Sequence, residues 1–448
     1  MELAEKLAIL SASAKYDASC ASSGSGAPGG NGSSGSGTRS SGVRGKGQAS
    51  SFGISVPMGV CHSWTEDGRC VSLLKLLFSN ACRYDCAYCV NRNSADTQRT
   101  SFTVNELVEI TCAFYRRNYI EGLFLSSGIF SDPDIVMEKL ILTAKKLRSE
   151  AGFGGYIHLK LIPGTGEKMI REAGLWADRL SANIELPTEK SLTYLAPQKS
   201  VKDILGAMEE AFNAGAENEE DRRKFRLGLK NAIPAFAPAG QSTQLVVGAT
   251  GENDKTIINL SSALYRKYLL RRVYYSAFIP VGVPGNGGIP DSRLPEIPIP
   301  PMYLSGPPGY LLHREHRLYQ ADWLLRFYKF SPGEILEGDE GFLDAAVDPK
   351  TAWALKHPDF FPVEVNRAGY DELLRVPGIG AKAGRRIIET RRSHSLSFET
   401  LRRLGVVLKR ARYFVTASGS FIERCENPKR IRRLLSDEDY LQPLLFEF

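Results

Sequence analysis

Apolar and polar residues follow two different periods along the first two thirds of the chain. Short apolar runs bounded by turn residues predict buried strands, and apolar residues every three or four positions predict amphipathic helices. The predicted strands are Val71–Phe78, Gly122–Leu125, Tyr156–Ile162, Arg179–Leu186, Gln244–Gly248 and Val273–Phe278. The predicted helices are the stretch from Val104 to Tyr115, Ile135–Leu147, Val201–Ala214 and Asp254–Lys267. This alternation predicts an α/β fold with a parallel sheet, whose chemistry collects beyond the C-terminal strand ends.

Two segments break this pattern. Residues 19–51 contain 10 Gly and 11 Ser in 33 positions, which predicts either a flexible tether or a mobile loop beside an active site. The Pro- and Gly-rich stretch 280–309 predicts an extended connection after the last strand. No run of about 18 apolar residues occurs, and the first residues lack a basic start, so we expect a cytoplasmic protein with no membrane span.

Charge separates the two ends of the chain. The 448 residues carry a formal charge of +7, and 17 Lys and Arg against 11 Asp and Glu lie from Val363 onward. A basic C-terminal region on a nearly neutral body indicates a separate domain that binds a polyanion.

Three of the eight cysteines form a cluster directly after the first predicted strand. Cys82, Cys86 and Cys89 have the spacing C-x3-C-x2-C. A mononuclear zinc site would need a fourth nearby ligand, and three buried structural cysteines are the other alternative. Three thiolates suit a [4Fe-4S] cluster that leaves one iron without a protein ligand. Such an open position lets a metal site bind a reactant, so we expect a reactive cluster here.

This motif, with Tyr88 as the aromatic residue before the last cysteine, resembles the radical S-adenosylmethionine (SAM) superfamily. The resemblance implies a partial (β/α)6 barrel over residues 55–285. It implies an enzyme whose cluster, reduced by a flavodoxin or ferredoxin, splits SAM into methionine and a 5′-deoxyadenosyl radical. That radical abstracts hydrogen from an unactivated carbon, while the protein positions and shields the reactants.

The same resemblance assigns SAM contacts to residues at the strand ends. Ser127 and Gly128 lie where the family's Gly-Gly-Glu motif holds the SAM amino group, although the glutamate is missing here, so only a backbone role carries over. The other implied contacts are Tyr88, Ser181, Asn183, Glu185 and Gly248. A polar barrel lining is the alternative for the alternating residues Ser181, Asn183 and Glu185. Lys160 could meet the SAM carboxylate or a substrate phosphate, or lie exposed at a strand end.

The remaining cysteines and histidines give weaker signals. Cys20, Cys61 and Cys70 could ligate a second cluster or be unbonded thiols, and Cys112 lies on an apolar helix face that predicts a core position. His313 and His316 alternate with Arg314 and Arg317, which predicts either a phosphate-facing basic strip or a solvated helix face.

The C-terminal region resembles a helix–hairpin–helix (HhH) module. Leu373 and Leu374 fall on a first helix, Pro377 ends it, and Gly378 and Gly380 permit a tight hairpin before a second helix. Bare N–H groups at the second helix start, with Lys382 and Arg385, would bind a phosphate. Such contacts read the backbone of a nucleic acid, not its sequence. A structural or protein-binding hairpin is the alternative, and Phe398–Phe414 resembles a degenerate second hairpin.

Over its whole length the chain is similar to the DNA modification/repair radical SAM proteins, which are linked to a uracil-DNA glycosylase-like partner. Tyr16–Gly24, Cys61–Cys70 and Cys86–Arg92 carry that similarity. It implies an N-terminal segment (1–54), the barrel (55–285), a Pro-rich connection with accessory helices (286–350) and a DNA-binding domain (351–448). We expect a radical SAM enzyme that modifies or repairs a nucleotide in DNA, with RNA modification and a non-catalytic Fe–S DNA-binding module as alternatives.

Overall fold

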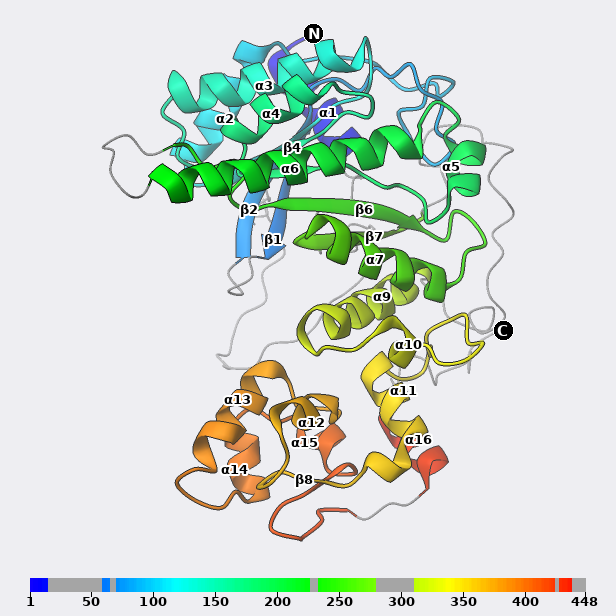
Figure 1. The fold of residues 1–448 in the computed structure, drawn as a ribbon. Helices are drawn as coiled ribbons and strands as arrows, with labels where there is room; N and C mark the ends of the chain where they lie inside the picture. The colour runs from blue at the N-terminus through cyan, green and yellow to red at the C-terminus, as the bar shows by residue number, and fades with distance from the viewer. Residues whose placement is uncertain (15–58, 65–69, 226–232, 279–309, 424–426, 437–448) are drawn as a thin grey trace, which may run out of the picture. The chain divides into compact units, whose positions relative to one another are not determined.

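The computed structural model describes residues 1–14, 59–64, 70–225, 233–278, 310–423 and 427–436. Its central element is a sheet whose strands follow one another in chain order (Figure 1). The first strand is antiparallel to the second, and the strands after it are parallel. The strands are β1 (Val60–Trp64), β2 (Cys70–Leu77), β3 (Gly122–Ser126), β4 (Tyr156–Lys160), β5 (Arg179–Ser181), β6 (Gln241–Val247) and β7 (Arg272–Ala277). The parallel strands β2 to β7 confirm the expected partial (β/α)6 barrel.

Helices connect the parallel strands and precede β1. They are α1 (Leu3–Ala14), α2 (Val104–Arg116), α3 (Pro133–Ser149), α4 (Glu167–Trp176), α5 (Glu189–Leu195), α6 (Val201–Phe225) and α7 (Asp254–Tyr268). Local sequence sets the start of several of them. A capping box of Thr103 and Glu106 begins α2, and Asp132 caps α3 with Pro133 in its first turn.

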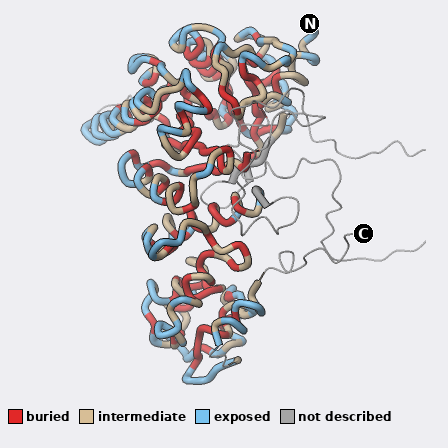
Figure 2. The backbone as a smooth tube through the Cα atoms, turned by 90° about the vertical axis from the view of Figure 1, so that its right-hand side faces the viewer, coloured by how far each residue is buried: buried red, intermediate tan, exposed pale blue. Residues whose placement is uncertain are grey.

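The strands of the sheet have two chemically different faces. Leu74, Leu76, Leu123, Leu125 and Leu159 are buried and alternate with the residues of the other face. This aliphatic set suits the buried apolar faces of the connecting helices α2 and α3. The opposite set, which we call the polar face, comprises Lys75, Phe124, Ser126, His158, Lys160 and Ser181. Figure 2 shows the strands among the buried parts of the backbone.

The structure corrects the extent of several predicted elements. The expected strand Arg179–Leu186 ends at Ser181. Glu185, later in the same stretch, takes a left-handed φ of 66°, which a regular strand excludes. Its backbone instead bonds to β6, with the N–H of Glu185 donating to the Gln244 carbonyl at 3.0 Å. The helix α6 continues to Phe225, beyond the expected end at Ala214, and the antiparallel strand β1 was not predicted.

A helical region follows the barrel strands, as expected. Its helices are α9 (Tyr310–Phe327), α10 (Pro332–Ile335), α11 (Pro349–Lys356), η1 (Pro358–Phe360), α12 (Tyr370–Arg375), α13 (Ala381–Thr390), α14 (Phe398–Arg403), α15 (Leu408–Ala411) and α16 (Pro428–Leu435). Two short parallel strands, β8 (Val363–Glu364) and β9 (Val415–Thr416), connect the start and the end of the segment that holds α12 to α15. The apolar core of this segment includes Leu373, Leu374, Ile387, Leu401 and Val415.

The chain divides into two compact units. The first unit comprises residues 1–84, 89–181 and 214–239, and the second comprises 85–88, 182–213 and 240–448. Across the described residues, no helix has the length and apolar character needed to cross a membrane.

Candidate functional site

The cysteine motif lies on an irregular loop that begins just after β2. Two of its sulfur atoms accept backbone hydrogen bonds: Tyr84 N–H donates to Cys82 Sγ and Asn91 N–H donates to Cys89 Sγ, both at 3.4 Å. Cys86 is buried, and none of the three cysteines is in a disulfide. Backbone N–H groups aimed at sulfur are a usual feature of iron–sulfur ligation, where they stabilise the negative charge.

Arg99 holds the two ends of this loop together, a role that sequence reasoning missed. Its guanidinium donates to four backbone carbonyls, those of Asn80, Asn91, Arg92 and Ala95, at 2.6–3.1 Å. The planar fork of an arginine can satisfy several carbonyls at once, which a lysine cannot. The chain has 57 Lys and Arg residues, and no local motif marks Arg99 as different from the others.

The segment after β3 packs against the start of the cysteine loop. Gly128 N–H donates to the Ser79 carbonyl at 2.7 Å, and Arg83 N–H donates to the Ile129 carbonyl at 2.8 Å. A Cβ atom on Gly128 would lie 2.3 Å from the Ala81 carbonyl oxygen, so only glycine permits this approach. The Ser127 hydroxyl donates to the Gly128 carbonyl at 2.7 Å. The loop geometry thus depends on the backbone of this segment, and the predicted contact of Ser127 and Gly128 with the SAM amino group stays a prediction.

In the second unit, a buried ion pair lies beside the aromatic residue of the motif. Lys199 Nζ is 2.6 Å from Glu185 Oε1 and 3.4 Å from the Tyr88 hydroxyl, and it also lies over the Tyr88 ring at 5.8 Å from its centre. Burial alone would lower the pKa of Lys199, but the charges of Glu185, Tyr88 and Cys86 outweigh it and raise that pKa well above its usual value. Lys199 therefore stays protonated and places a fixed positive charge beside Cys86 and Tyr88.

Lys199 was absent from the predicted site, although it links two predicted residues, Tyr88 and Glu185. It falls in the short connection between α5 and α6, where the sequence shows no motif. Only the left-handed turn at Glu185 brings the carboxylate to it.

The other predicted SAM contacts occupy varied positions. Ser181, at the end of β5, is buried with its Oγ 2.8 Å from His158 Nε2. Asn183 is buried, and its amide donates to Gln244 Oε1 at 3.5 Å. Gly248 follows β6 with a φ of 89°, a conformation that favours glycine. Since the strand ends at Ser181, the three alternating residues do not share one regular strand face.

The predicted phosphate-binding hairpin lies between α12 and α13. Gly378 has a φ of 84°, and a Cβ atom there would lie 2.5 Å from the Val407 carbonyl oxygen. The N–H of Val407 donates to the Gly378 carbonyl at 2.9 Å, so this turn packs against the turn between α14 and α15. Gly380 begins α13 without any side-chain cap. Lys382 and Arg385 are exposed on the first turns of α13, and neither forms an ion pair with a described residue.

A buried lysine supports this hairpin from α11. Lys350 Nζ donates to the Ile379 carbonyl at 2.6 Å and lies 4.6 Å from the centre of the Tyr328 ring. Burial, opposed by the nearby Asp348 and reinforced by the charge of Arg375, lowers the pKa of Lys350 to about 7. No feature of the sequence indicated this contact.

Other predicted positions have structural roles or lie outside the described residues. Arg314 forms a buried ion pair with Asp254 at 2.7 Å, and Arg317 is also buried, so the predicted basic strip on α9 is wrong. The prediction failed because both guanidiniums point into the protein interior to acidic and carbonyl groups. Cys112 is buried in α2, as expected. Cys20 and the side chains of Cys61 and Cys70 lie outside the described residues, as do the Gly/Ser-rich and Pro-rich segments.

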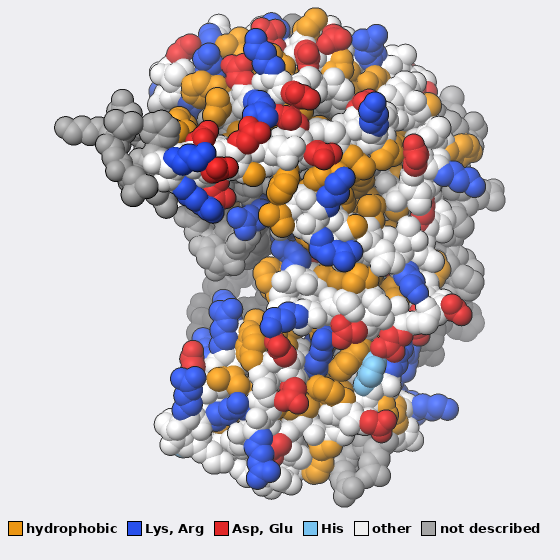
Figure 3. All heavy atoms as spheres, in the orientation of Figure 1, with side chains coloured by type: hydrophobic (Ala, Val, Ile, Leu, Met, Phe, Trp, Pro, Cys, Tyr) orange, Lys and Arg blue, Asp and Glu red, His pale blue; other side chains and the backbone are white. Residues whose placement is uncertain are grey.

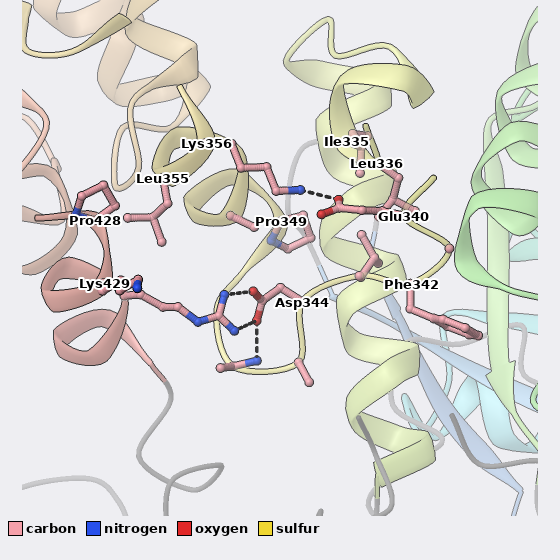
Figure 4. A pocket seen from close by; sticks show the side chains of 16 residues that line it. Ile335, Leu336, Glu340, Phe342, Asp344, Pro349, Leu355, Lys356, Pro428 and Lys429 are labelled. Carbon is pink, nitrogen blue, oxygen red and sulfur yellow. Dashed lines mark hydrogen bonds and ion pairs between the residues drawn. The ribbon is translucent and has the colours of Figure 1, made fainter. Parts of the chain in front are cut away.

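A pocket of about 570 Å³ lies between the α10–α11 segment and α16 (Figure 4). Its walls are mainly apolar, with Leu336, Phe342 and Pro349, and an ion pair of Arg432 with Asp344 lies at its edge. None of its lining residues is a predicted site residue.

Comparison with known proteins identifies the domain that carries the cysteine loop. Residues 76–262 match the model of the Radical SAM superfamily. The chain thus contains a radical SAM domain, and such a domain uses a [4Fe-4S] cluster and SAM. No curated protein matches the chain.

Several solved structures are similar to this chain at low sequence identity. They include HydG, a maturase of the [FeFe]-hydrogenase (15% identity, 55% of this chain and 48% of that chain, TM-score 0.39). HydG from Carboxydothermus hydrogenoformans has 16% identity over 48% of this chain and 46% of its own, with a TM-score of 0.37. Methylornithine synthase (PylB) has 18% identity over 49% of this chain and 57% of its own, with a TM-score of 0.35. The similar part thus spans about half of each solved structure.

The chemistry of the donor set fits the cluster. Three thiols lie within eight residues on a loop anchored by Arg99, and two of the sulfur atoms already accept N–H bonds. Among the residues that the structure describes, no three His, Cys, Asp or Glu side chains form a group that could hold a metal ion, and this includes the three cysteines of the motif.

Proposed function

Since residues 76–262 match the Radical SAM superfamily, we propose that the chain is a radical SAM enzyme that acts on a nucleotide in DNA, which the C-terminal helices bind through its phosphates. The observation that carries this proposal is the start of α13. An uncapped helix N-terminus, a glycine turn and two unpaired exposed cations meet there. Helix N-termini bind anions because their first N–H groups lack partners and the helix dipole is positive at that end.

The surface around α13 supports binding along a polyanion. Besides Lys382 and Arg385, the exposed cations of this region are Arg386, Arg392, Arg402, Arg403 and Lys409. Figure 3 shows Lys and Arg side chains over the region of α13 and α14, interspersed with acidic side chains. We interpret α12–α13 and α14–α15 as two HhH units, whose mutual packing at Gly378 and Val407 would present two phosphate contacts on one rigid body.

In the radical SAM domain, this chain's residues position the cofactors. Cys82, Cys86 and Cys89 would hold the cluster, and Arg99 fixes the loop that carries them. When bound, the cluster and SAM supply a 5′-deoxyadenosyl radical that abstracts hydrogen from carbon. The Glu185–Lys199 pair keeps its charges in place beside Tyr88, where the SAM amino acid or ribose would be oriented. A target base would have to leave the helical stack to reach this site, and a uracil-DNA glycosylase-like partner would act on the same nucleotide.

The test is anaerobic SAM cleavage by the reconstituted protein with dithionite, followed as 5′-deoxyadenosine with and without duplex DNA. We expect production that rises with duplex DNA and does not rise with RNA of the same sequence. If 5′-deoxyadenosine production does not change when DNA is added, DNA is not the substrate. The assignment as a radical SAM enzyme would still be supported. A matched Lys382→Glu protein should lose the stimulation by DNA and keep the basal rate, because its change lies in the hairpin.

A further inference from the structure

The polar face of the sheet carries a row of positively charged and polar side chains in the first unit. Strand register places Lys75 beside Phe124 and Phe124 beside His158, on three neighbouring parallel strands. Lys160 and Ser181 form the next pair toward the C-terminal strand ends. Paired residues of neighbouring parallel strands point to the same face of the sheet, so these side chains lie together on one face.

Lys75 is a buried lysine without a counter-charge. Only 6% of its surface is exposed, and its Nζ lies 5.6 Å from the centre of the Phe124 ring. Within the described ranges it forms no ion pair or side-chain hydrogen bond. A desolvated charge without a partner costs several kcal/mol, so proteins rarely keep one without a use.

His158 is a neutral hydrogen-bonding group in the same row. It is 3% exposed, contacts the edge of Phe124 with ring centres 4.6 Å apart, and shares a 2.8 Å hydrogen bond with Ser181 Oγ. Burial and the positive charges of Arg179, Lys160 and Lys75 keep the pKa of His158 well below its usual value. Among the described residues, the charges that lower this pKa belong to three cations, which favours an anion on this face of the sheet.

We propose that this row binds a phosphate group of the substrate, with Lys75 as the principal cation and the Ser181–His158 pair as the source of one neutral hydrogen-bond donor. A phosphate carries up to two negative charges and several acceptor oxygens, which suits a buried lysine beside a neutral hydrogen-bond donor better than a carboxylate does. The inference rests on the proposed function, since it names phosphate as the group by which the radical SAM domain would hold its nucleotide. The anion is bound separately from the phosphates that the hairpin contacts.

The experiment is calorimetric titration of the reconstituted full-length protein with inorganic phosphate at constant ionic strength. All proteins carry Lys382→Glu, which removes the hairpin as a phosphate site. Lys75→Met is compared with the matched control Lys168→Met, which removes an exposed lysine of α4 in the same unit. We expect Lys75→Met to weaken phosphate binding about tenfold or more, while Lys168→Met leaves it unchanged.

Two further measurements separate binding from structure. Lys75→Met should raise the melting temperature, because it removes an uncompensated buried charge and keeps the length of the side chain. Lys75→Arg keeps the positive charge and should therefore keep phosphate binding. Phosphate affinity within about twofold of the parent in Lys75→Met would overturn the site, as would acetate binding as tightly as phosphate.

These outcomes are independent of SAM cleavage. The titration needs no SAM and no DNA, so it can fail while DNA-dependent 5′-deoxyadenosine production succeeds. Conversely, phosphate binding lost only in Lys75→Met would stand even if DNA proved not to stimulate cleavage.

Discussion

The cysteine loop and the α12–α13 hairpin are both tight loops that present groups to a ligand, yet they use opposite means. The cysteine loop is anchored from within, by the Arg99 guanidinium and by the Gly128 backbone. The Glu185–Lys199 pair beside it is almost wholly buried. The hairpin leaves its N–H groups and the cations Lys382 and Arg385 exposed.

The difference follows from what each loop would hold. A cluster and a radical reaction need water excluded, so charges there must be paired or tightly bonded. A nucleic-acid phosphate is negatively charged and surrounded by counterions. Exposed cations can bind it by displacing those counterions, so the affinity depends on salt concentration. Substitutions should therefore act on chemistry and stability in the first region and on salt-dependent affinity in the second.

The largest effect is expected from Cys86→Ala. Loss of one of three ligands should abolish the bound cluster and reduce SAM cleavage by about three orders of magnitude or more, because the reaction has no other electron source. Iron content, the absorbance of the cluster and 5′-deoxyadenosine yield measure this. The control Cys112→Ala changes a buried cysteine of α2 and should keep both. DNA affinity that fell together with the cluster would contradict the separation of the two regions.

Lys199→Met should come next. It leaves the Glu185 carboxylate buried without a partner, which typically costs about 3 kcal/mol of unfolding free energy. Chemical denaturation measures the loss, and SAM affinity should fall as well. The double variant Lys199→Met with Glu185→Gln should recover most of the stability, since it removes both charges. If the double variant is no more stable than the single one, the pair is not the cause.

Lys382→Glu tests the exposed region. We expect about tenfold weaker binding to duplex DNA at moderate salt and a salt dependence smaller by about one phosphate contact. Fluorescence anisotropy at several salt concentrations gives both values. Lys168→Glu makes the same charge change on α4 and serves as the control. Equal weakening in both variants would point to net charge and exclude a specific contact at α13.

The smallest effect is expected at Lys350, which is buried beneath the exposed hairpin. Its pKa of about 7 lies below the value of 10.5 for an unfolded lysine, so the unfolded state binds more protons between these pH values. The unfolding free energy should therefore rise with pH across this window, by at most about 1.4 kcal/mol per pH unit from this group. Denaturation at pH 7 to 9.5 should show a smaller slope in Lys350→Met. Lys356→Met, on an exposed position of the same helix, should keep the slope of the parent.

Much of the fold could be predicted because the local signals are strong. The aliphatic run at β2 and the helical spacing at α2 and α3 predicted elements that the structure contains. Burial of those apolar residues stabilises the same elements that the local pattern favours. The end of β5 could not be predicted. The sequence Arg179–Leu186 alternates like a strand, whereas the left-handed Glu185 is held by β6 and by Lys199, which lie elsewhere in the chain.

The sequence by itself determined the three-cysteine motif after the first parallel strand, the glycine turn at Gly378 and the residues that begin α13. Spacing within a few residues and backbone freedom are local properties, so no distant contact is needed to recognise them. Only the tertiary structure decided which charges are paired. It joined Arg99 to the cysteine loop, Lys199 to Glu185 and Lys350 to Ile379, and it left Lys75 without a partner among the described residues. The physical reason is that the energy of a charge depends on its burial and on its neighbours in space, and neither can be read from its position along the chain.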